Sequence, residues 1–234
     1  MAATTRRQAA VEAERVQVET LLKADLFGRV ERGHSSRLGP VVRRDTRAAR
    51  WWLRPLARRL ARREAAALAA LEGLPGVPRL LSWDGRVLLR TWLEGRPLHR
   101  GGPPDPDWFE AARRLVCRLH RRGVCHNDLA KEPNLLVAAD GRPALIDFQL
   151  ARVTRRRSRW FRLQAREDLR HLLKHKRSYA PARLRPRERR ILARPSWPAR
   201  LWRRSGKRLY LAVTRGLLGW ADREGAGDRG GTGA

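Results

Sequence analysis

The segment that most constrains this chain covers residues 126–148. It contains an acid, Asp128, then an amide, Asn134, and then a second acid, Asp147. Short apolar runs lie on both sides of the Asp-Gly pair at 140–141, and such a pair is a strong hairpin signal. We therefore expect Asn134 and Asp147 at the two ends of one hairpin, with Asp128 on the loop that precedes it.

These side chains suit the transfer of a phosphoryl group from ATP. That reaction requires a protein to orient the acceptor hydroxyl, hold Mg²⁺ on the phosphates and offset negative charge. Asp128 is expected to accept or orient the hydroxyl proton, and Asn134 and Asp147 offer the oxygen ligands that Mg²⁺ prefers. Lys131, on the same loop, is expected to neutralise the transferring phosphate. The segment thus predicts an ATP- and Mg²⁺-dependent kinase.

The order of these residues resembles the protein-kinase-like superfamily. Within it, the chain is most similar to bacterial lipopolysaccharide core kinases, which phosphorylate heptose or 3-deoxy-D-manno-octulosonic acid, and to RIO-type atypical kinases. The resemblance covers about residues 24–180 and implies an α+β, two-lobed fold with a small β-rich N-lobe, a helical C-lobe and a basic helical C-terminal extension. It depends on Leu119, His120, Gly123, His126, Asp128, Asn134, Ile146, Asp147 and Phe148.

The chain departs from the family pattern at two positions in this segment. Five residues separate Asp128 from Asn134, whereas the usual signature has four. Gln149 replaces the glycine that normally follows Asp-Phe. The first departure predicts a loop that bulges by one residue, and the second argues against a mobile activation segment.

The remaining sequence divides into a predicted N-lobe (1–95), a C-lobe (96–220) and a disordered tail (221–234). The C-lobe is expected to begin with a helix over 108–122, because apolar residues recur at helical spacing and Gly123 offers a left-handed cap. The N-lobe lacks a Gly-x-Gly-x-x-Gly loop. It is expected to hold an N-terminal helix, strands over 26–32, 39–43, 79–83 and 86–93, a turn over 33–36, and a helix over 56–71.

The nucleotide site is assigned by the resemblance. Glu64, on the predicted helix, matches the acid that pairs with a strand lysine in the family, and Arg43 takes the place of that lysine. Arg44 is expected on the opposite face of the strand. An arginine keeps the charge but differs in shape, so activity could be lost. Lys23 and Lys131 are alternative phosphate partners, and Arg43 and Arg44 as solvated residues are the alternative interpretation.

The resemblance also implies a hinge between the lobes. There, main-chain groups near Trp92, Leu93 and Glu94 are expected to bind adenine. Cys117 and Cys125 lack metal-ligand spacing, which favours two buried, reduced thiols. No apolar run is long enough for a membrane span, and no secretory signal is apparent, so we expect a cytoplasmic protein.

The formal net charge of +30 predicts an anionic partner. Much of the excess lies between residues 152 and 208, where aromatic residues alternate with arginine and lysine. Such helices suit the surface of an anionic membrane, which would place the protein peripherally on the inner face of the cytoplasmic membrane. Nucleic acid is an alternative partner without a supporting motif, and a solvated helix surface is a third interpretation.

Three functions therefore compete. The first is a kinase that phosphorylates a sugar hydroxyl of lipopolysaccharide core or a related glycolipid. The second keeps the chemistry and transfers phosphate to a serine or threonine of a protein, as in RIO-type kinases. The third is a pseudokinase that binds a membrane or nucleic acid. The sequence leaves the acceptor, the regulation and the oligomeric state undetermined.

Overall fold

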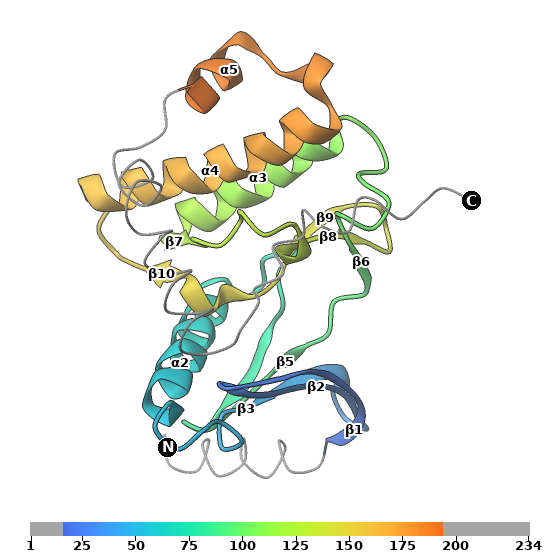
Figure 1. The fold of residues 1–234 in the computed structure, drawn as a ribbon, viewed down its shortest axis with the longest axis vertical. Helices are drawn as coiled ribbons and strands as arrows, with labels where there is room; N and C mark the ends of the chain where they lie inside the picture. Colours follow the sequence, from blue (N-terminus) through green and yellow to red (C-terminus); the bar gives the residue numbers. More distant parts are fainter. Residues whose placement is uncertain (1–15, 194–234) are drawn as a thin grey trace, which may run out of the picture.

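The computed structural model describes residues 16–193, which form two connected halves (Figure 1). Several predicted features lie outside these residues: the N-terminal helix, the basic and aromatic positions beyond residue 193, and the tail over 221–234. No helix within the described range is long and apolar enough to cross a membrane.

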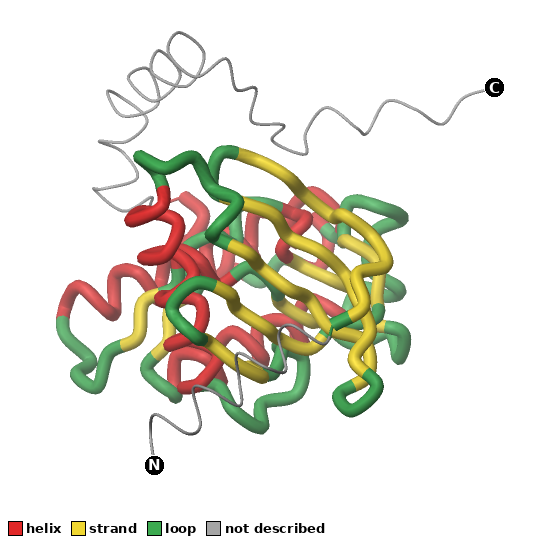
Figure 2. The backbone as a smooth tube through the Cα atoms, turned by 90° about the horizontal axis from the view of Figure 1, so that it is seen from below, coloured by secondary structure: helices red, strands yellow, loops and turns green. Residues whose placement is uncertain are grey.

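The small half is an antiparallel five-stranded sheet with one helix. The strand order is β1-β2-β3-β5-β4, and the helix α2 connects β3 to β4. Figure 2, seen from below, shows the strands running side by side with helices grouped next to them. The element bounds are β1 Gln17–Asp25, β2 Gly28–Ser35, β3 Gly39–Asp45, α2 Arg54–Ala70, β4 Leu80–Trp83 and β5 Val87–Thr91.

The predicted strands and helix of this half are present, with shifted ends. The strand expected over 39–43 extends to Asp45, and the strand expected over 86–93 ends at Thr91. Residues 26–27 form the turn between β1 and β2, so the expected strand begins two residues later. The pairing of Ser35 with Gly39 places the next turn at 36–38 instead of 33–36. Gln17–Asp25 forms a strand that was not expected from the sequence.

The larger half is mainly helical and contains two small sheets. One sheet has the order β6-β8-β9, and the other pairs β10 with β7. Its strands are β6 Gly95–Pro97, β7 Val124–Cys125, β8 Leu135–Ala138, β9 Pro143–Leu145 and β10 Arg152–Val153. Its helices are α3 Trp108–Arg121, α4 Arg159–Tyr179 and α5 Pro186–Ala193, with short 3₁₀ turns η1 Glu132–Asn134, η2 Phe148–Leu150 and η3 Pro181–Arg183.

The predicted helix and hairpin of the larger half are confirmed. α3 ends before Gly123, which has a φ of +74°, and the N–H of Gly123 bonds the carbonyl oxygen of His120 at 3.0 Å. A side chain there would also meet the carbonyl oxygen of Thr154 at 2.2 Å, so glycine is required twice over. β8 and β9 form the antiparallel hairpin around 140–141.

One hydrophobic core joins the two halves. The C-terminal end of α2 contributes Leu68 and Leu71, which lie in the same buried cluster as Leu119 of α3 and Leu145 of β9. α2 therefore packs on the larger half while its remaining length covers the sheet of the small half. The architecture is the two-lobed, kinase-like α+β fold expected from the sequence.

Candidate active site

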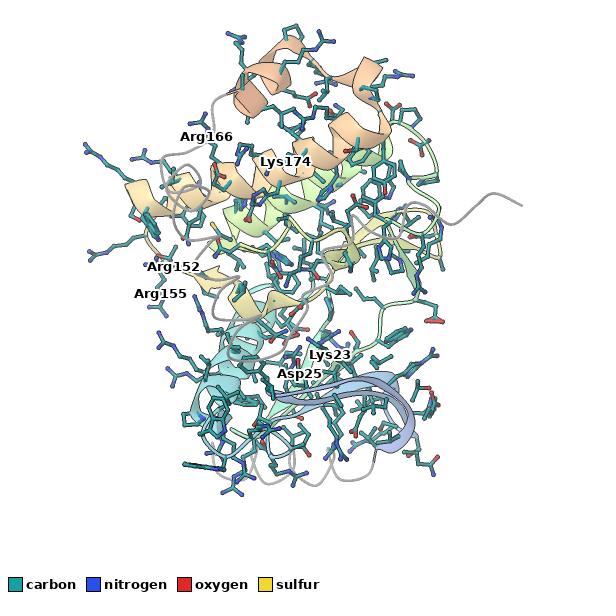
Figure 3. The ribbon with its side chains drawn as sticks, in the orientation of Figure 1. Lys23, Asp25, Arg152, Arg155, Arg166 and Lys174 are labelled. Atoms are coloured by element: carbon teal, nitrogen blue, oxygen red, sulfur yellow. The ribbon has the colours of Figure 1, made fainter. Side chains whose placement is uncertain are left out.

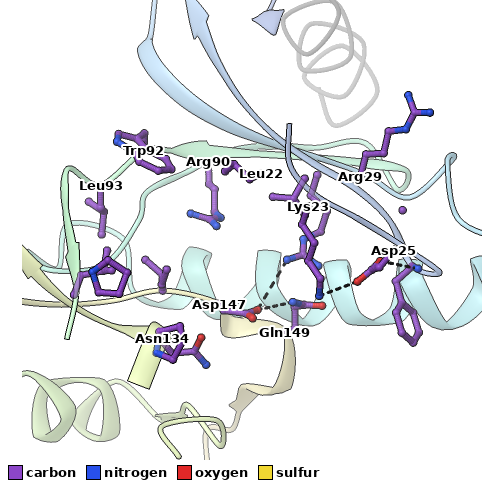
Figure 4. A pocket seen from close by; sticks show the side chains of 18 of the residues that line it. Leu22, Lys23, Asp25, Arg29, Arg90, Trp92, Leu93, Asn134, Asp147 and Gln149 are labelled. Atoms are coloured by element: carbon purple, nitrogen blue, oxygen red, sulfur yellow. Dashed lines mark hydrogen bonds and ion pairs between the residues drawn. The ribbon is translucent and has the colours of Figure 1, made fainter. Parts of the chain in front are cut away.

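A cavity of about 300 Å³ lies between the two halves. Its size falls at the lower end of the range for small-molecule sites. Figure 4 shows Arg90 and Lys23 above this cavity and Asn134 and Asp147 below it, and Figure 3 places Lys23 between the halves. Trp92 and Leu93, from the segment that joins the halves, also line it.

The loop before the hairpin brings Asp128 and Asn134 together. The amide Nδ2 of Asn134 donates to Oδ2 of Asp128 at 3.0 Å and to its main-chain oxygen at 2.9 Å. Since both of these bonds use the nitrogen, the amide oxygen of Asn134 remains for a cation. The amine of Lys131 lies 3.4 Å from the same carboxylate oxygen of Asp128.

The environment of Asp128 favours its neutral form. Burial raises the pKa of this carboxyl, and the negative charge of Asp147 adds to the effect. Lys131 and the hydrogen bond from Asn134 oppose the shift without cancelling it. A carboxylate whose pKa is raised toward neutrality is a better general base.

A buried acid on α4 holds the main chain of this loop. Asp168 is 1% exposed, and its two oxygens accept the main-chain N–H groups of His126 and Asn127, each at 2.8 Å. Nε2 of His120 is 3.0 Å from Oδ2 of Asp168. Asp168 was not predicted from the sequence, because an acid within a run of arginines is expected to do no more than balance their charge. No local signal identifies its partners, which lie more than forty residues away.

His126 connects the loop to the segment around Asp147. It is fully buried, its Nδ1 accepts the N–H of Asp128 at 3.3 Å, and its Nε2 is 3.0 Å from the carbonyl oxygen of Ile146. Its ring also packs beside Phe148, with 4.6 Å between centroids. The loop and the second acid are therefore held in a fixed relation.

Glu132 lies on the loop between Asp128 and Asn134 and is 5% exposed. Tyr179 donates its hydroxyl proton to Glu132 at 2.8 Å, and Nδ1 of His175 lies 3.5 Å from the other carboxylate oxygen. Nε2 of His175 also lies 2.8 Å from the carbonyl oxygen of Leu129. α4 thus anchors the middle of the loop as well as its start.

Asp147 has an unusual backbone and a stabilised charge. Its φ is +64°, a conformation that non-glycine residues seldom adopt outside functional sites. Burial acts to raise its pKa, but the charge of Arg44 and the hydrogen bond from Gln149 outweigh burial and lower the pKa. Nε2 of Gln149 donates to Oδ1 of Asp147 at 2.5 Å, and Nη2 of Arg44 is 3.9 Å from the same oxygen.

Asn134 and Asp147 fit a magnesium ion by their donor set. Both line the cavity, and they present an amide oxygen and an ionised carboxylate. A different cluster, made of His120, Cys125 and Asp168, is the one group of three potential ligands found among residues 16–193. Burial raises the pKa of the Cys125 thiol to about 12, and both oxygens of Asp168 are already bonded to the main chain of the loop.

The expected pairing of Arg43 with Glu64 is wrong. Arg43 contacts Glu31 at 2.6 Å and Asp45 at 3.0 Å, whereas Nε of Arg44 lies 3.3 Å from the fully buried carboxylate of Glu64. The assignment of the lysine position to Arg43 was one residue out of register. Because a shift of one residue along a strand exchanges its two faces, Arg44 and not Arg43 lies on the side of Glu64. Arg44 lines the cavity together with Arg90, whose Nε is 3.1 Å from Glu64.

The hinge contributes Leu93 to the cavity. No hydrogen bond within residues 16–193 uses the main-chain N–H or C=O of Leu93, so both groups remain for a ligand. Glu94 does not line the cavity: its carbonyl oxygen accepts from Ala139 at 3.3 Å, and its side chain accepts from the indole of Trp92. The main-chain N–H of Trp92 is bonded to the carbonyl oxygen of Pro40 at 3.0 Å, so of the three residues expected near adenine the geometry favours Leu93.

The tight turn between β1 and β2 lines the cavity on the side of the small half. Asp25, Phe27 and Gly28 line the cavity there, and the N–H of Phe27 bonds the carboxylate of Asp25 at 2.8 Å. Gly28 has a φ of +124°, and a side chain would meet the carbonyl oxygen of Asp45 at 2.2 Å. Lys23 pairs with Asp25 at 2.8 Å and also lines the cavity.

A comparison with protein families agrees with this geometry. The model of the phosphotransferase enzyme family, APH, matches residues 48–156. The matched range includes Glu64, Asp128, Asn134 and Asp147, and it ends before α4. The match supports a phosphotransferase of the protein-kinase-like superfamily, and it does not separate the two narrower resemblances.

Proposed function

We propose that the protein is an ATP- and Mg²⁺-dependent kinase that phosphorylates an alcohol group, a sugar hydroxyl of lipopolysaccharide core or a related glycolipid. One observation carries the proposal. Asp128 and Asn134 are directly hydrogen-bonded, and Asn134 shares one cavity with Asp147 and Arg44. A base, two oxygen ligands and a phosphate-binding cation are therefore arranged around one space.

In this proposal Asp128 is the general base. Its carboxylate accepts the proton of the acceptor hydroxyl as the oxygen attacks the γ-phosphorus and the bond to ADP breaks. The raised pKa suits this role, because proton acceptance improves as the pKa of the base approaches the working pH. Lys131, beside that carboxylate, is placed to offset charge on the transferring group.

The nucleotide would occupy the cavity with its adenine at the hinge. The N–H and C=O of Leu93 supply the main-chain hydrogen bonds, and Arg44, held by Glu64, binds phosphate oxygens. Asn134 and Asp147 would hold Mg²⁺, whose chemistry when bound is to neutralise phosphate charge. We assign this role to Arg44 instead of Arg43, because the side chain of Arg43 forms an ion pair with Glu31.

The sugar acceptor rests on the resemblance and on charge. A basic protein favours an acceptor that carries phosphate or carboxylate groups, as core glycolipids do. Such an acceptor would place the protein on the inner face of the cytoplasmic membrane. A protein serine or threonine is the second candidate acceptor, supported by the resemblance to RIO-type kinases, and a pseudokinase is the alternative without chemistry.

Nucleotide binding is the first test. ATP with Mg²⁺ is expected to raise the melting temperature of the protein more than ATP alone, because ligand binding stabilises the folded state by mass action. Purified protein with labelled ATP and Mg²⁺ should also transfer or hydrolyse phosphate. No shift and no turnover at millimolar ATP would leave the pseudokinase.

The acceptor requires a cellular test. Mass spectrometry of glycolipid from cells with and without the gene is expected to show the loss of one phosphate on a core sugar. The gene carrying Asp128→Asn should fail to restore that phosphate. If the glycolipid is the same with and without the gene while the purified enzyme is active, a protein serine or threonine becomes the favoured acceptor.

A further inference from the structure

The outer face of α2 combines a row of arginines with exposed tryptophans. Trp51 is 78% exposed, Trp52 is 48% exposed and Leu56 is 43% exposed. Large apolar side chains gathered at one place on a surface mark an interaction site. The next turns of the same helix expose four arginines: Arg58, Arg59, Arg62 and Arg63.

The charge of this face is unbalanced. Arg58 and Arg62, and likewise Arg59 and Arg63, are four residues apart, so like charges are neighbours on the helix. None of the four forms an ion pair within the described part of the chain, and residues 46–63 contain no acid. Because such repulsion destabilises a helix, an external anion is the natural partner.

The arginines also frame a concave surface. With Pro55, Trp83 and Gly85 they line an open hollow between α2 and the turn that joins β4 to β5. A row of guanidinium groups binds phosphate oxygens through paired hydrogen bonds. The tryptophans immediately precede the first turn of the same helix.

We propose that this face of α2, defined by Trp51, Trp52, Leu56 and the four arginines, docks on an anionic lipid bilayer. Tryptophan favours the boundary between lipid and water, and arginines beside it meet the lipid phosphates. The phosphates of a nucleic acid would also bind the arginines. A nucleic acid does not, however, explain why Leu56 is exposed beside two tryptophans. The surface is distinct from the basic segment beyond residue 152 that the sequence indicated.

The docked face lies behind the active site. The opposite side of α2 carries Glu64, which holds Arg44 and Arg90 in the cavity. Membrane contact and nucleotide positioning would therefore share one helix. The inference does not depend on phosphotransfer, and its test measures binding alone.

The experiment is sedimentation of the full chain with vesicles of phosphatidylcholine, with and without phosphatidylglycerol. A variant with Arg→Gln at 58, 59, 62 and 63 is expected to bind anionic vesicles about 600-fold more weakly, since each of the four cations near the headgroups contributes about five-fold. The matched control changes Arg177, Arg183, Arg189 and Arg190 to Gln. These exposed arginines lie at the far end of the larger half, around α5 (Figure 1), and the control should bind nearly as the natural chain.

A second variant separates insertion from charge. Trp51→Ser with Trp52→Ser leaves the net charge unchanged, and it is expected to weaken vesicle binding about 10-fold and to remove a blue shift of tryptophan emission. Trp160→Ser, at another exposed tryptophan, is its control. Melting temperatures confirm that each variant is folded.

Three outcomes would overturn the proposal. Equal loss in the α2 variant and its α5 control would show that only total charge matters. Retained vesicle binding in the α2 variant would place the contact elsewhere. Loss of duplex DNA retention in the α2 variant, with vesicle binding intact at the same salt, would assign the face to nucleic acid.

Discussion

The loop over residues 126–134 and the pair Arg44 and Arg90 both reach the cavity, but they are held in different ways. In the larger half, the buried carboxylate of Asp168 bonds two main-chain N–H groups and fixes the shape of a loop. In the small half, the buried carboxylate of Glu64 lies between the guanidinium groups of Arg44 and Arg90 and balances their charge. One acid determines where a backbone runs, and the other determines whether two cations can be buried together.

The largest expected effect is the loss of phosphotransfer in Asp128→Asn. Removal of a general base lowers rates by about 10²- to 10⁴-fold. The expected result is a fall of this size in kcat with little change in the melting-temperature shift caused by ATP and Mg²⁺. Equal turnover in the variant would remove Asp128 from the mechanism.

The stability of the same variant provides a control. Because the folded-state pKa of Asp128 is raised, its contribution to stability is fully present below the pKa of the unfolded chain and is lost as pH rises through the folded pKa. Ionised Asp128 therefore destabilises the fold at neutral pH. Asp128→Asn should not lower the melting temperature at pH 7, which separates lost chemistry from lost folding.

Asp168→Ala tests the acid that shapes the loop. The main-chain N–H groups of His126 and Asn127 would lose their acceptor inside the protein, at about 4 kcal/mol in total. The melting temperature should fall by on the order of 10 °C, and activity should fall with it. Asp168→Asn keeps one acceptor oxygen and should lose less, and a melting temperature unchanged in both variants would contradict the assignment.

Glu64→Gln tests the acid that balances charge. It removes the nearest counter-charge of the buried Arg44 and Arg90, which should destabilise the protein by about 3 kcal/mol. Unlike Asp168→Ala, this variant should regain stability on addition of ATP, whose phosphates replace the missing charge. Equal response of the two variants to ATP in thermal unfolding would remove the proposed difference between the regions.

Arg44→Ala and Arg43→Ala form a matched pair on one strand. Arg44 faces the cavity, and its loss should raise the KM for ATP about 10- to 100-fold, as expected for a charge-assisted phosphate contact. Arg43 faces Glu31 and Asp45, so its loss should lower stability modestly and leave the KM nearly unchanged. The reverse result would restore the assignment of Arg43 made from the sequence.

The same contrast explains what the sequence could predict. Asp128, Asn134 and Asp147 were found because one short loop and one hairpin bring them together, so chain connectivity fixes most of their geometry. The strand with Arg43 and Arg44 was predicted too. The alternation of side chains along a strand shows only that these two residues point to opposite faces. Which face meets the cavity depends on how β3 pairs with β2 and β5 and lies near α2, and no local pattern encodes that.

The long-range contacts that hold the loop could not be predicted from the sequence for the same reason. The contact of Tyr179 with Glu132 spans 47 residues, and the contacts of Asp168 with the loop span 41 and 42 residues. The spacing of Asp128 and Asn134 predicted a bulge, but it did not identify the groups that hold this loop. The sequence shows that Gln149 replaces the family glycine. Its hydrogen bond to Asp147 became apparent only from the folded structure.

The smallest effect is expected for Lys131→Ala, and it distinguishes electrostatic support of the base from contact with phosphate. The positive charge of Lys131 lowers the pKa of Asp128 against the dominant effect of burial, so its removal should raise that pKa further. The acid limb of kcat/KM should then move to higher pH, because Asp128 must be ionised to accept a proton. The shift should be small and should shrink with added salt, since the lysine side chain is 45% exposed.

The alkaline end of the same profile shows whether Lys131 has a second role. Above both pKa values the base is ionised in either protein, so a purely electrostatic role predicts equal rates for Lys131→Ala and the natural chain. A loss that persists at high pH and is repaired by Lys131→Arg would show that the cation also contacts the transferring phosphate. An acid limb that stays in place, or moves to lower pH, would contradict the coupling between Lys131 and Asp128, because removing a nearby positive charge can only favour the protonated carboxyl.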